Sequence, residues 1–263
     1  MKEIQIIDFH THPYLSQEEF YCFYPDSFTP SVTQCMEDIR KAGISHICGS
    51  VILKKKYESG FDYIKDCNDR AFEIKKALGD FYTPGLHVHP EFVKESIAEI
   101  ELRHKQGFVL VGELVPYMHG WKDYSRKDLG EILEAAEHYN MPVSFHTVGS
   151  EQKEMDKMVE DHPGVTFIAA HPGDKEQFLL HLERIKKHDN YWLDLSGTGI
   201  FRYGLIAHGV KEVGSERLIF GTDYPICNPR MYVQAVYQEP ISEEDIENIL
   251  YKNAQKILEG CNK

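Results

Sequence analysis

Two histidines near the N-terminus have a spacing that suits metal binding. His10 and His12 close the segment Asp8-Phe9-His10-Thr11-His12. Because side chains alternate along an extended strand, both imidazoles point to the same side and can share one ion. Asp8 has the same parity, so it could support the imidazoles from behind or cap the adjacent loop.

Three further segments close a short apolar run with one residue that can bind a metal. They are Ser144-Phe145-His146-Thr147, Ala169-Ala170-His171-Pro172-Gly173 and Phe220-Gly221-Thr222-Asp223-Tyr224-Pro225. Taken singly, each such residue could simply hydrogen-bond a loop. If the runs are strands of one barrel, their ends meet at one mouth, where active sites of that fold lie. Imidazole and carboxylate ligands suit Zn²⁺ and also Fe²⁺ or Mn²⁺.

The chain has the alternation of elements that this convergence requires. Short apolar runs are followed by polar or Gly/Pro turns and then by amphipathic stretches, which predicts βα units and a parallel sheet. The expected strands are 4–9, 46–53, 81–88, 108–115, 142–146, 166–170, 191–195 and 217–220. The expected helices lie near 32–42, 62–78, 92–105, 127–139, 151–161, 174–188, 201–213 and 242–259.

Eight alternations in 263 residues favour an α/β fold of the (β/α)₈ type, a TIM barrel formed by residues 1–263 as a single domain. A doubly wound open sheet is the structural alternative. At the start of the last expected helix, Ser242 is followed three residues later by Asp245, the acidic variant of a capping box.

The composition narrows the class of partner. A net charge of −13 argues against extended nucleic acid and against an anionic membrane surface. No apolar run approaches the roughly 20 residues that cross a bilayer, and the expected first strand leaves no room for a signal peptide. Six cysteines without a CxxC pair indicate reduced thiols in a cytoplasmic protein. We expect a small-molecule substrate, and the sequence leaves homo-oligomerisation open.

Together, the four strand ends resemble the amidohydrolase superfamily, over nearly the whole chain and in the family's order. More narrowly they resemble the amidohydrolase 2 group, which includes aminocarboxymuconate-semialdehyde decarboxylase and several lactonases. The resemblance implies that His10, His12, His146 and Asp223 ligate a divalent metal, with Zn²⁺ expected and Mn²⁺ or Fe²⁺ as alternatives. It also implies that His171 lies beside the metal to polarise substrate or help transfer protons.

Glu113 leaves the number of metals open. It follows Gly112 at the end of the fourth expected strand. In related binuclear members, including the TatD-like nucleases, a carboxylate or carboxylated lysine on that strand bridges two metals. The resemblance therefore favours Glu113 as a bridging ligand, with His171 on the second metal. The alternative is a buried carboxylate that supports a mononuclear site.

Residues that could bind substrate lie in the loops that follow the strands. Residues 13–30, which include Tyr14, carry six aromatic side chains and could form a lid or pocket wall, or pack on themselves. Trp121 could line the same pocket or anchor its loop. Arg202 follows the glycine-containing loop 194–200 and could pair with a substrate anion or form a salt bridge in its loop.

Two other motifs have lower functional weight. His87-Val88-His89 closes the third expected strand, where we expect pocket lining at best. Cys227 would need an activating base to serve as a nucleophile, and a metal site removes that need, so we expect a structural role.

The expected reaction is metal-assisted hydrolysis of a small-molecule ester, lactone, amide or phosphoester, in which a metal lowers the pKa of water to about 7. Asp223 would accept the water's proton and return it to the leaving group, while His171 helps polarise the scissile group. Non-oxidative decarboxylation at the same site and a TatD-like phosphoesterase are the alternatives. A non-catalytic metal-binding scaffold is disfavoured, because a degenerate relative would have lost at least one ligand.

Overall fold

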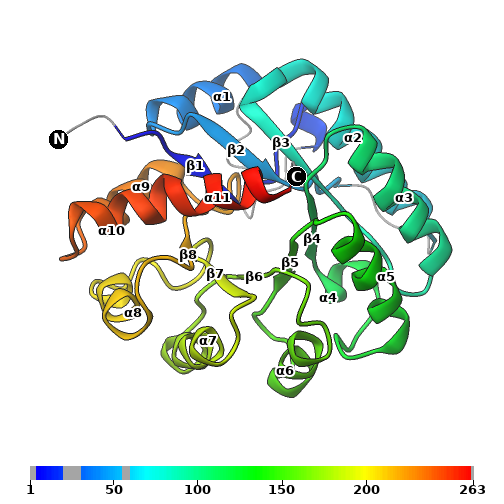
Figure 1. The fold of residues 1–263 in the computed structure, drawn as a ribbon. Helices are drawn as coiled ribbons and strands as arrows, with labels where there is room; N and C mark the ends of the chain where they lie inside the picture. The colour runs from blue at the N-terminus through cyan, green and yellow to red at the C-terminus, as the bar shows by residue number, and fades with distance from the viewer. Residues whose placement is uncertain (1–3, 20–30, 55–59, 262–263) are drawn as a thin grey trace.

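The computed structural model describes residues 4–19, 31–54 and 60–261. Eight parallel strands follow one another in sequence order, each hydrogen-bonded to the next (Figure 1). They are β1 (Ile7–Asp8), β2 (His46–Gly49), β3 (Tyr82–Leu86), β4 (Leu110–Leu114), β5 (Val143–His146), β6 (Phe167–Ala170), β7 (Tyr191–Asp194) and β8 (Leu218–Ile219).

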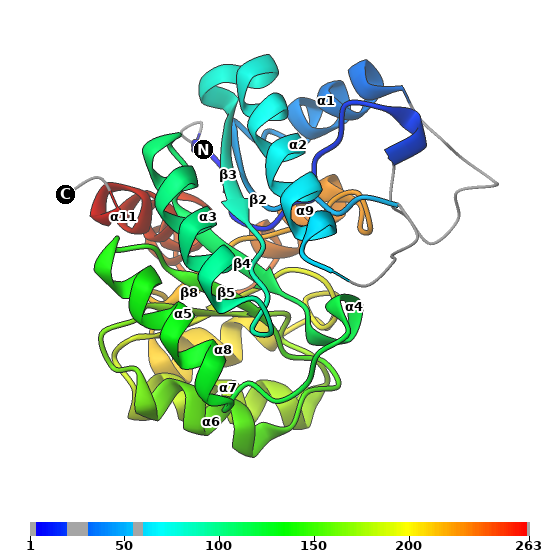
Figure 2. The ribbon, with the colours of Figure 1, turned by 90° about the vertical axis from the view of Figure 1, so that its right-hand side faces the viewer.

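Helices alternate with these strands and lie around them (Figures 1 and 2). They are α1 (Val32–Lys41), α2 (Asp62–Leu78), α3 (Val93–Lys105), α4 (Pro116–His119), α5 (Lys127–His138), α6 (Gln152–Asp161), α7 (Lys175–Lys187), α8 (Leu205–Val213), α9 (Pro229–Tyr237), α10 (Glu243–Glu247) and α11 (Asn253–Gly260). A π-helical segment, Asn248–Lys252, joins the last two. No described helix has the length and apolarity to span a membrane.

The two ends of the strand series are hydrogen-bonded to each other. Past the end of β8, Asp223 N donates to His10 O at 2.8 Å, and His12 N donates to Tyr224 O at 2.7 Å. The buried carboxylate of Asp8 accepts hydrogen bonds from the backbone N–H and the hydroxyl of Thr222, at 2.9 and 2.6 Å. Sequential strand order with linked ends is consistent with a (β/α)₈ barrel and not with a doubly wound sheet, in which the strand order reverses.

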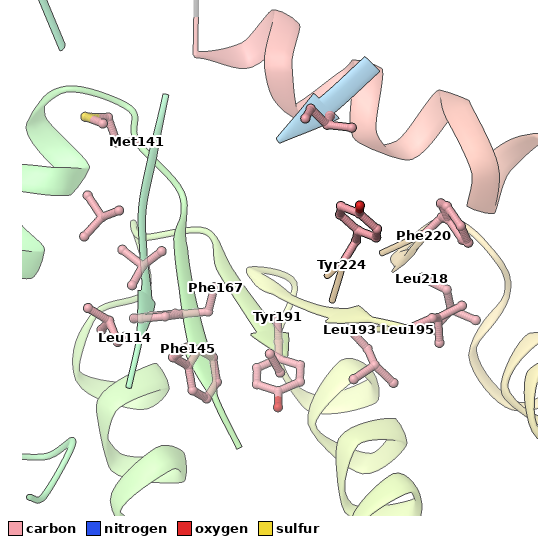
Figure 3. Packing of buried hydrophobic residues seen from close by; sticks show 14 of the residues in the cluster. Leu114, Met141, Phe145, Phe167, Tyr191, Leu193, Leu195, Leu218, Phe220 and Tyr224 are labelled. Atoms are coloured by element: carbon pink, nitrogen blue, oxygen red, sulfur yellow. The ribbon is translucent and has the colours of Figure 1, made fainter. Parts of the chain in front are cut away.

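Side chains of β5 to β7 alternate between the helix layer and the barrel interior. Phe145 packs edge-to-face against Phe167 and Tyr191, with ring centroids 6.1 and 6.2 Å apart (Figure 3). These rings belong to a core that includes helical side chains such as Phe178. The strand period of two therefore turns the neighbouring residues, among them Asp194, to the opposite side of the sheet.

A second buried cluster joins Ile168, Trp192 and Ile219 of the strands to Ala254 and Ile257 of α11. These strand residues alternate with those that face the surrounding helices, so they point to the opposite side of the sheet. The C-terminal helix α11 covers them there. Burial of these side chains stabilises the sheet that positions the strand ends.

The expected elements occur with few exceptions, and the capping box of Ser242 and Asp245 is present. Two helices were not predicted, α4 and α9. At α9 the signals were in the sequence: Asn228 caps the helix by accepting from the N–H groups of Arg230 and Met231, and Pro229 occupies its first turn. The single helix expected at 242–259 is interrupted by the π-helical segment.

Candidate metal centre

Side chains from the ends of β1, β4, β6 and β8 meet in two overlapping groups. Within each group, one ligand atom per residue lies within 4.8 Å of the others. The first group consists of His10, Glu113 and His171, and the second of His10, His12 and Asp223. All of these residues are buried. The predicted ligand His146 belongs to neither group and contacts the centre through Glu113.

Glu113 lies between two pairs of imidazoles. Its Oε2 is 3.4 Å from His10 Nε2 and 3.8 Å from His12 Nε2. Its Oε1 is 2.8 Å from His146 Nδ1 and 3.5 Å from His171 Nε2. Each carboxylate oxygen therefore faces a different pair.

The residues that follow β6 and β8 adopt a backbone conformation that is uncommon outside glycine. His171 has φ 75° and Asp223 has φ 63°. Such conformations cost on the order of 1–3 kcal/mol and cluster at functional sites. In this conformation Asp223 Oδ1 lies 3.4 Å from His12 Nε2 and 3.7 Å from His10 Nε2.

Three residues for which the sequence predicted no role form hydrogen bonds with the candidate ligands. Asp194 accepts a hydrogen bond from His10 Nδ1 at 2.5 Å. Ser50 accepts from His12 Nδ1 through its carbonyl at 2.9 Å and from the N–H of Glu113 through its hydroxyl at 3.2 Å.

The third of these residues is Ser196, whose hydroxyl is hydrogen-bonded to His171 Nδ1 at 3.1 Å. Such contacts fix the tautomer and direction of an imidazole. The available signal was position: Ser50, Asp194 and Ser196 are polar residues at or directly after strand ends.

Asp8, which could have supported the imidazoles, contacts the backbone instead. Its Oδ1 accepts from the N–H of His10 at 3.2 Å, and both oxygens hold Thr222. Burial raises the pKa of this carboxyl to about 7. Asp8 therefore ties the β1 end to the loop that carries Asp223.

The imidazoles and carboxylates of the centre shift one another's pKa values. Burial opposes a charge on His10, but the carboxylates of Asp194 and Glu113 outweigh it and raise the pKa of the imidazole well above its usual value. Burial opposes ionisation of Glu113 too, but His10 and His146 outweigh it and hold that pKa well below its usual value. The cluster therefore keeps carboxylates ionised and attracts positive charge.

One buried atom tests whether these residues suit a metal. His10 Nε2 is buried and has no hydrogen-bond partner among the described residues. Nδ1 donates to Asp194, so a metal that displaced the Nε2 proton would meet a lone pair that points towards the carboxylate oxygens of Glu113 and Asp223. The raised pKa of His10 shows that these atoms favour a positive charge between them, and a metal cation can take the place of the proton. Imidazole and carboxylate donors fit a divalent transition metal at that place.

A cavity of about 530 Å³ opens above the centre. His12, Glu113, His146, His171 and Asp223 line it, which brings the predicted ligand residues other than His10 to one surface. Unpredicted lining residues come from the segments after the strands. They are Ile52, Val115, Tyr117, Met118, Val148, Gly197, Thr198, Phe201, Ile226, Cys227 and Tyr232.

The three residues predicted to bind substrate do not line this cavity. Tyr14 is buried and its hydroxyl contacts Cys35 Sγ. Trp121 is buried against Tyr124, with ring centroids 5.6 Å apart, as a loop anchor would be. Arg202 is exposed and donates to Gly173 O at 3.0 Å.

The lid predicted for residues 13–30 falls largely on 20–30, which lie outside the described residues. Of the second histidine pair, His87 is buried and donates from Nε2 to Val51 O at 2.8 Å, and burial lowers its pKa to about 4. His89 lines a separate cavity with Phe92 and His119. Neither belongs to the metal centre.

Solved structures of similar fold include an uncharacterised TIM-barrel protein from Bordetella bronchiseptica, with TM-score 0.75 and 20% identity over 99% of this chain and 100% of that one. A 5-carboxyvanillate decarboxylase from Sphingomonas paucimobilis has TM-score 0.73 and 13% identity, over 97% of this chain and 99% of that one. A dihydroxybenzoic acid decarboxylase from a Polaromonas species, with bound manganese and the inhibitor 2-nitroresorcinol, has TM-score 0.74 and 15% identity, over 99% and 98%.

At these identities the solved structures show a common fold. No curated protein sequence matches the chain. Residues 7–260 match the profile described as amidohydrolase. That match covers nearly all of the chain, including every predicted metal ligand, and the chain therefore belongs to the amidohydrolase family, in its amidohydrolase 2 group.

Proposed function

We propose that the chain is a metal-dependent hydrolase of a small-molecule ester, lactone, amide or phosphoester, with one catalytic domain over residues 1–263. The observation that supports this is the placement of Glu113, whose two oxygens face different imidazole pairs. A carboxylate in that position can bridge two divalent cations, and paired cations are typical of hydrolytic centres.

In this proposal His10, His12 and Asp223 would hold one cation, His146 and His171 would hold the other, and Glu113 would be a ligand of both. Zn²⁺ or Mn²⁺ would supply Lewis acidity, making water a better nucleophile and polarising the scissile group. Asp223 accepts the proton of the attacking water and then donates it to the leaving group. Asp194, Ser50 and Ser196 keep the imidazoles oriented towards the centre.

Non-oxidative decarboxylation is the second candidate, and the comparisons favour it over hydrolysis. Two of the similar structures are decarboxylases of aromatic acids, one of them with manganese. On this chain the substrate carboxylate would lie at the metal centre. The bond between the carboxylate and the neighbouring carbon would break with release of CO₂. That carbon would then take a proton from Asp223 or His171.

Metal content tests the two-cation proposal directly. Elemental analysis of purified protein should give two equivalents of transition metal, and Glu113→Gln should give one while circular dichroism remains that of the wild type. Glu183→Gln changes an exposed carboxylate and should retain two equivalents. A single equivalent in wild type and Glu113→Gln alike would contradict the bridge.

Product analysis separates the two reactions. The metal-loaded protein is incubated with esters, lactones, amides and phosphoesters, and in parallel with aromatic carboxylic acids. Release of alcohol, amine or phosphate supports hydrolysis. Release of CO₂ from the acids, with no hydrolysis of the first set, would replace our proposal by the second candidate.

A further inference from the structure

The wall of the cavity above the metal centre is mostly apolar. Its apolar side chains are Ile52, Val115, Met118, Val148, Phe201 and Ile226. The other side chains with polar atoms are Thr198, Cys227 and the two tyrosines, Tyr117 and Tyr232. Among the described lining residues, no lysine or arginine occurs, and the carboxylates are those of the metal centre, Glu113 and Asp223.

The polar atoms of Tyr232 and Cys227 are already engaged with protein. The Tyr232 hydroxyl donates to Gly197 O and lies 3.3 Å from Cys227 Sγ. Tyr117 is 68% exposed, and its ring packs against that of His146 with 5.3 Å between the centroids. The wall therefore offers a ligand mainly apolar surface.

The nearby cation of Arg202 is also engaged elsewhere. Its guanidinium donates to Gly173 O at 3.0 Å, and its Cζ lies 4.8 Å from the ring centroid of Phe201. Phe201 lines the cavity, whereas Arg202 does not. Binding of a substrate anion by Arg202 would have to break these contacts.

Electrostatics then limits the substrate. A charged group pressed against an apolar wall loses hydration and gains no partner, which is costly. The chain's net charge of −13 adds long-range repulsion for an anion. Among the described lining residues, the strongly polar groups belong to the metal centre.

We propose that the substrate directs its single polar reacting group to the metal centre and an uncharged, apolar body to the wall. Substrates with a second charged group remote from the reacting one are excluded. This inference rests on the proposed function, because it names the substrate class of the same centre. It assigns selectivity to wall residues such as Val148 and Phe201.

A pair of hydroxamates tests the inference without turnover. Hydroxamates chelate divalent cations, so 4-methylbenzohydroxamic acid and 4-carboxybenzohydroxamic acid should bind at the centre and differ only in the group that meets the wall. Calorimetry with the zinc-loaded protein should give a Kd at least about tenfold lower for the methyl compound, a ratio equivalent to about 1.4 kcal/mol.

Two lysine variants locate the effect. Val148→Lys brings an ammonium group to the wall at a site that is already 37% exposed, and it should narrow or reverse the ratio of the two Kd values. Met231→Lys adds the same charge to an exposed position of α9 outside the lining, and it should leave the ratio unchanged.

Equal or tighter binding of the carboxy compound to the wild type would overturn the inference. If Arg202→Met then abolished that binding, Arg202 would be the anion anchor. An unchanged ratio in Val148→Lys would also contradict the wall's role. If only the hydrolase proposal were wrong, the expected ratio of the two hydroxamate Kd values would still be found, but no ester, lactone, amide or phosphoester would be hydrolysed. Absence of binding by both compounds would overturn the metal centre and the inference together.

Discussion

At the residue scale, Asp194 determines which nitrogen of His10 faces the centre. It is buried, and its Oδ1 is held by the N–H of Ser196 at 2.7 Å while Oδ2 accepts from His10 Nδ1. His10 is shared by both groups of candidate ligands. Weakening this hydrogen bond should therefore affect metal binding more than folding.

We expect Asp194→Asn to raise the Kd for Zn²⁺ about 10- to 100-fold, the usual loss when a ligand's supporting carboxylate is removed. Competition with a chromophoric chelator measures the Kd. Asp189→Asn, at a fully exposed position just before β7, is the matched control and should bind Zn²⁺ like the wild type. Equal affinity in all three proteins would show that Asp194 does not position His10.

Asp223 has two proposed tasks, as ligand and as proton acceptor. Asn retains an oxygen ligand, lacks basicity and tolerates the positive φ of this position. Asp223→Asn should remain folded and metal-loaded, with kcat lowered about 10²- to 10⁴-fold. Kinetics with parallel elemental analysis check this. A loaded variant with near-normal kcat would make His171 the base, and His171→Asn would then have to show the loss.

At the scale of elements, the loop after β7 is packed closely against the residue that follows β6. A Cβ on Gly197, which has φ +59°, would lie 2.3 Å from His171 Nδ1. Gly204 in the same connection has φ +86°, but a Cβ added there would have no atom within 4 Å. The two glycines thus separate backbone strain from a clash with the centre.

Gly204→Ala should lower the free energy of unfolding by about 1 kcal/mol through backbone strain alone. Gly197→Ala should lose at least about 1 kcal/mol more, because the methyl group must displace His171 or the loop. It should also reduce metal content, whereas Gly204→Ala should not. Urea unfolding and elemental analysis provide the measurements. Similar losses in both variants would show that the loop can move away from His171 freely.

At the scale of the whole molecule, a buried histidine links folding to pH. His181 is fully buried, and its Nδ1 is hydrogen-bonded to the Tyr191 hydroxyl at 2.7 Å. Its Nε2 has no hydrogen-bond partner among the described residues. Burial lowers the pKa of this imidazole from 6.5 to about 3. The imidazole of His181 is therefore neutral in the folded protein at neutral pH.

Between pH 6.5 and 3 the unfolded chain binds a proton at this histidine and the folded chain does not, so stability falls as the pH falls. The contribution approaches about 1.4 kcal/mol per pH unit well below pH 6.5. Between about pH 7 and 5, the wild type should lose roughly 2 kcal/mol more than His181→Gln. Urea titrations at the two pH values measure this. His138→Gln, at an exposed position, should follow the wild type, and parallel behaviour of all three proteins would refute the assignment.

Much of the architecture followed from local sequence, because the periodicities of strands and helices are properties of neighbouring residues. The eight apolar runs and their amphipathic partners predicted the parallel βα order that the structure has. Side chains that can bind a metal follow several of these runs. Because parallel strands that pair in order bring their ends together, those side chains predicted a shared centre. The roles of individual ligands stay predictions until metal content is measured.

Tertiary structure alone decided what surrounds those side chains. Asp194 supports His10 across 184 positions of the chain, a pairing that no local pattern encodes. The orientation of Glu113 between two imidazole pairs depends on how β4 lies relative to three other strands, β1, β5 and β6. The residues of the cavity wall could not be predicted from the sequence either. Trp121 and Arg202 are residue types that often line pockets, but Trp121 is buried and Arg202 donates to a backbone carbonyl. Sequence by itself determined which chemistry was available, and long-range packing determined which groups face the cavity.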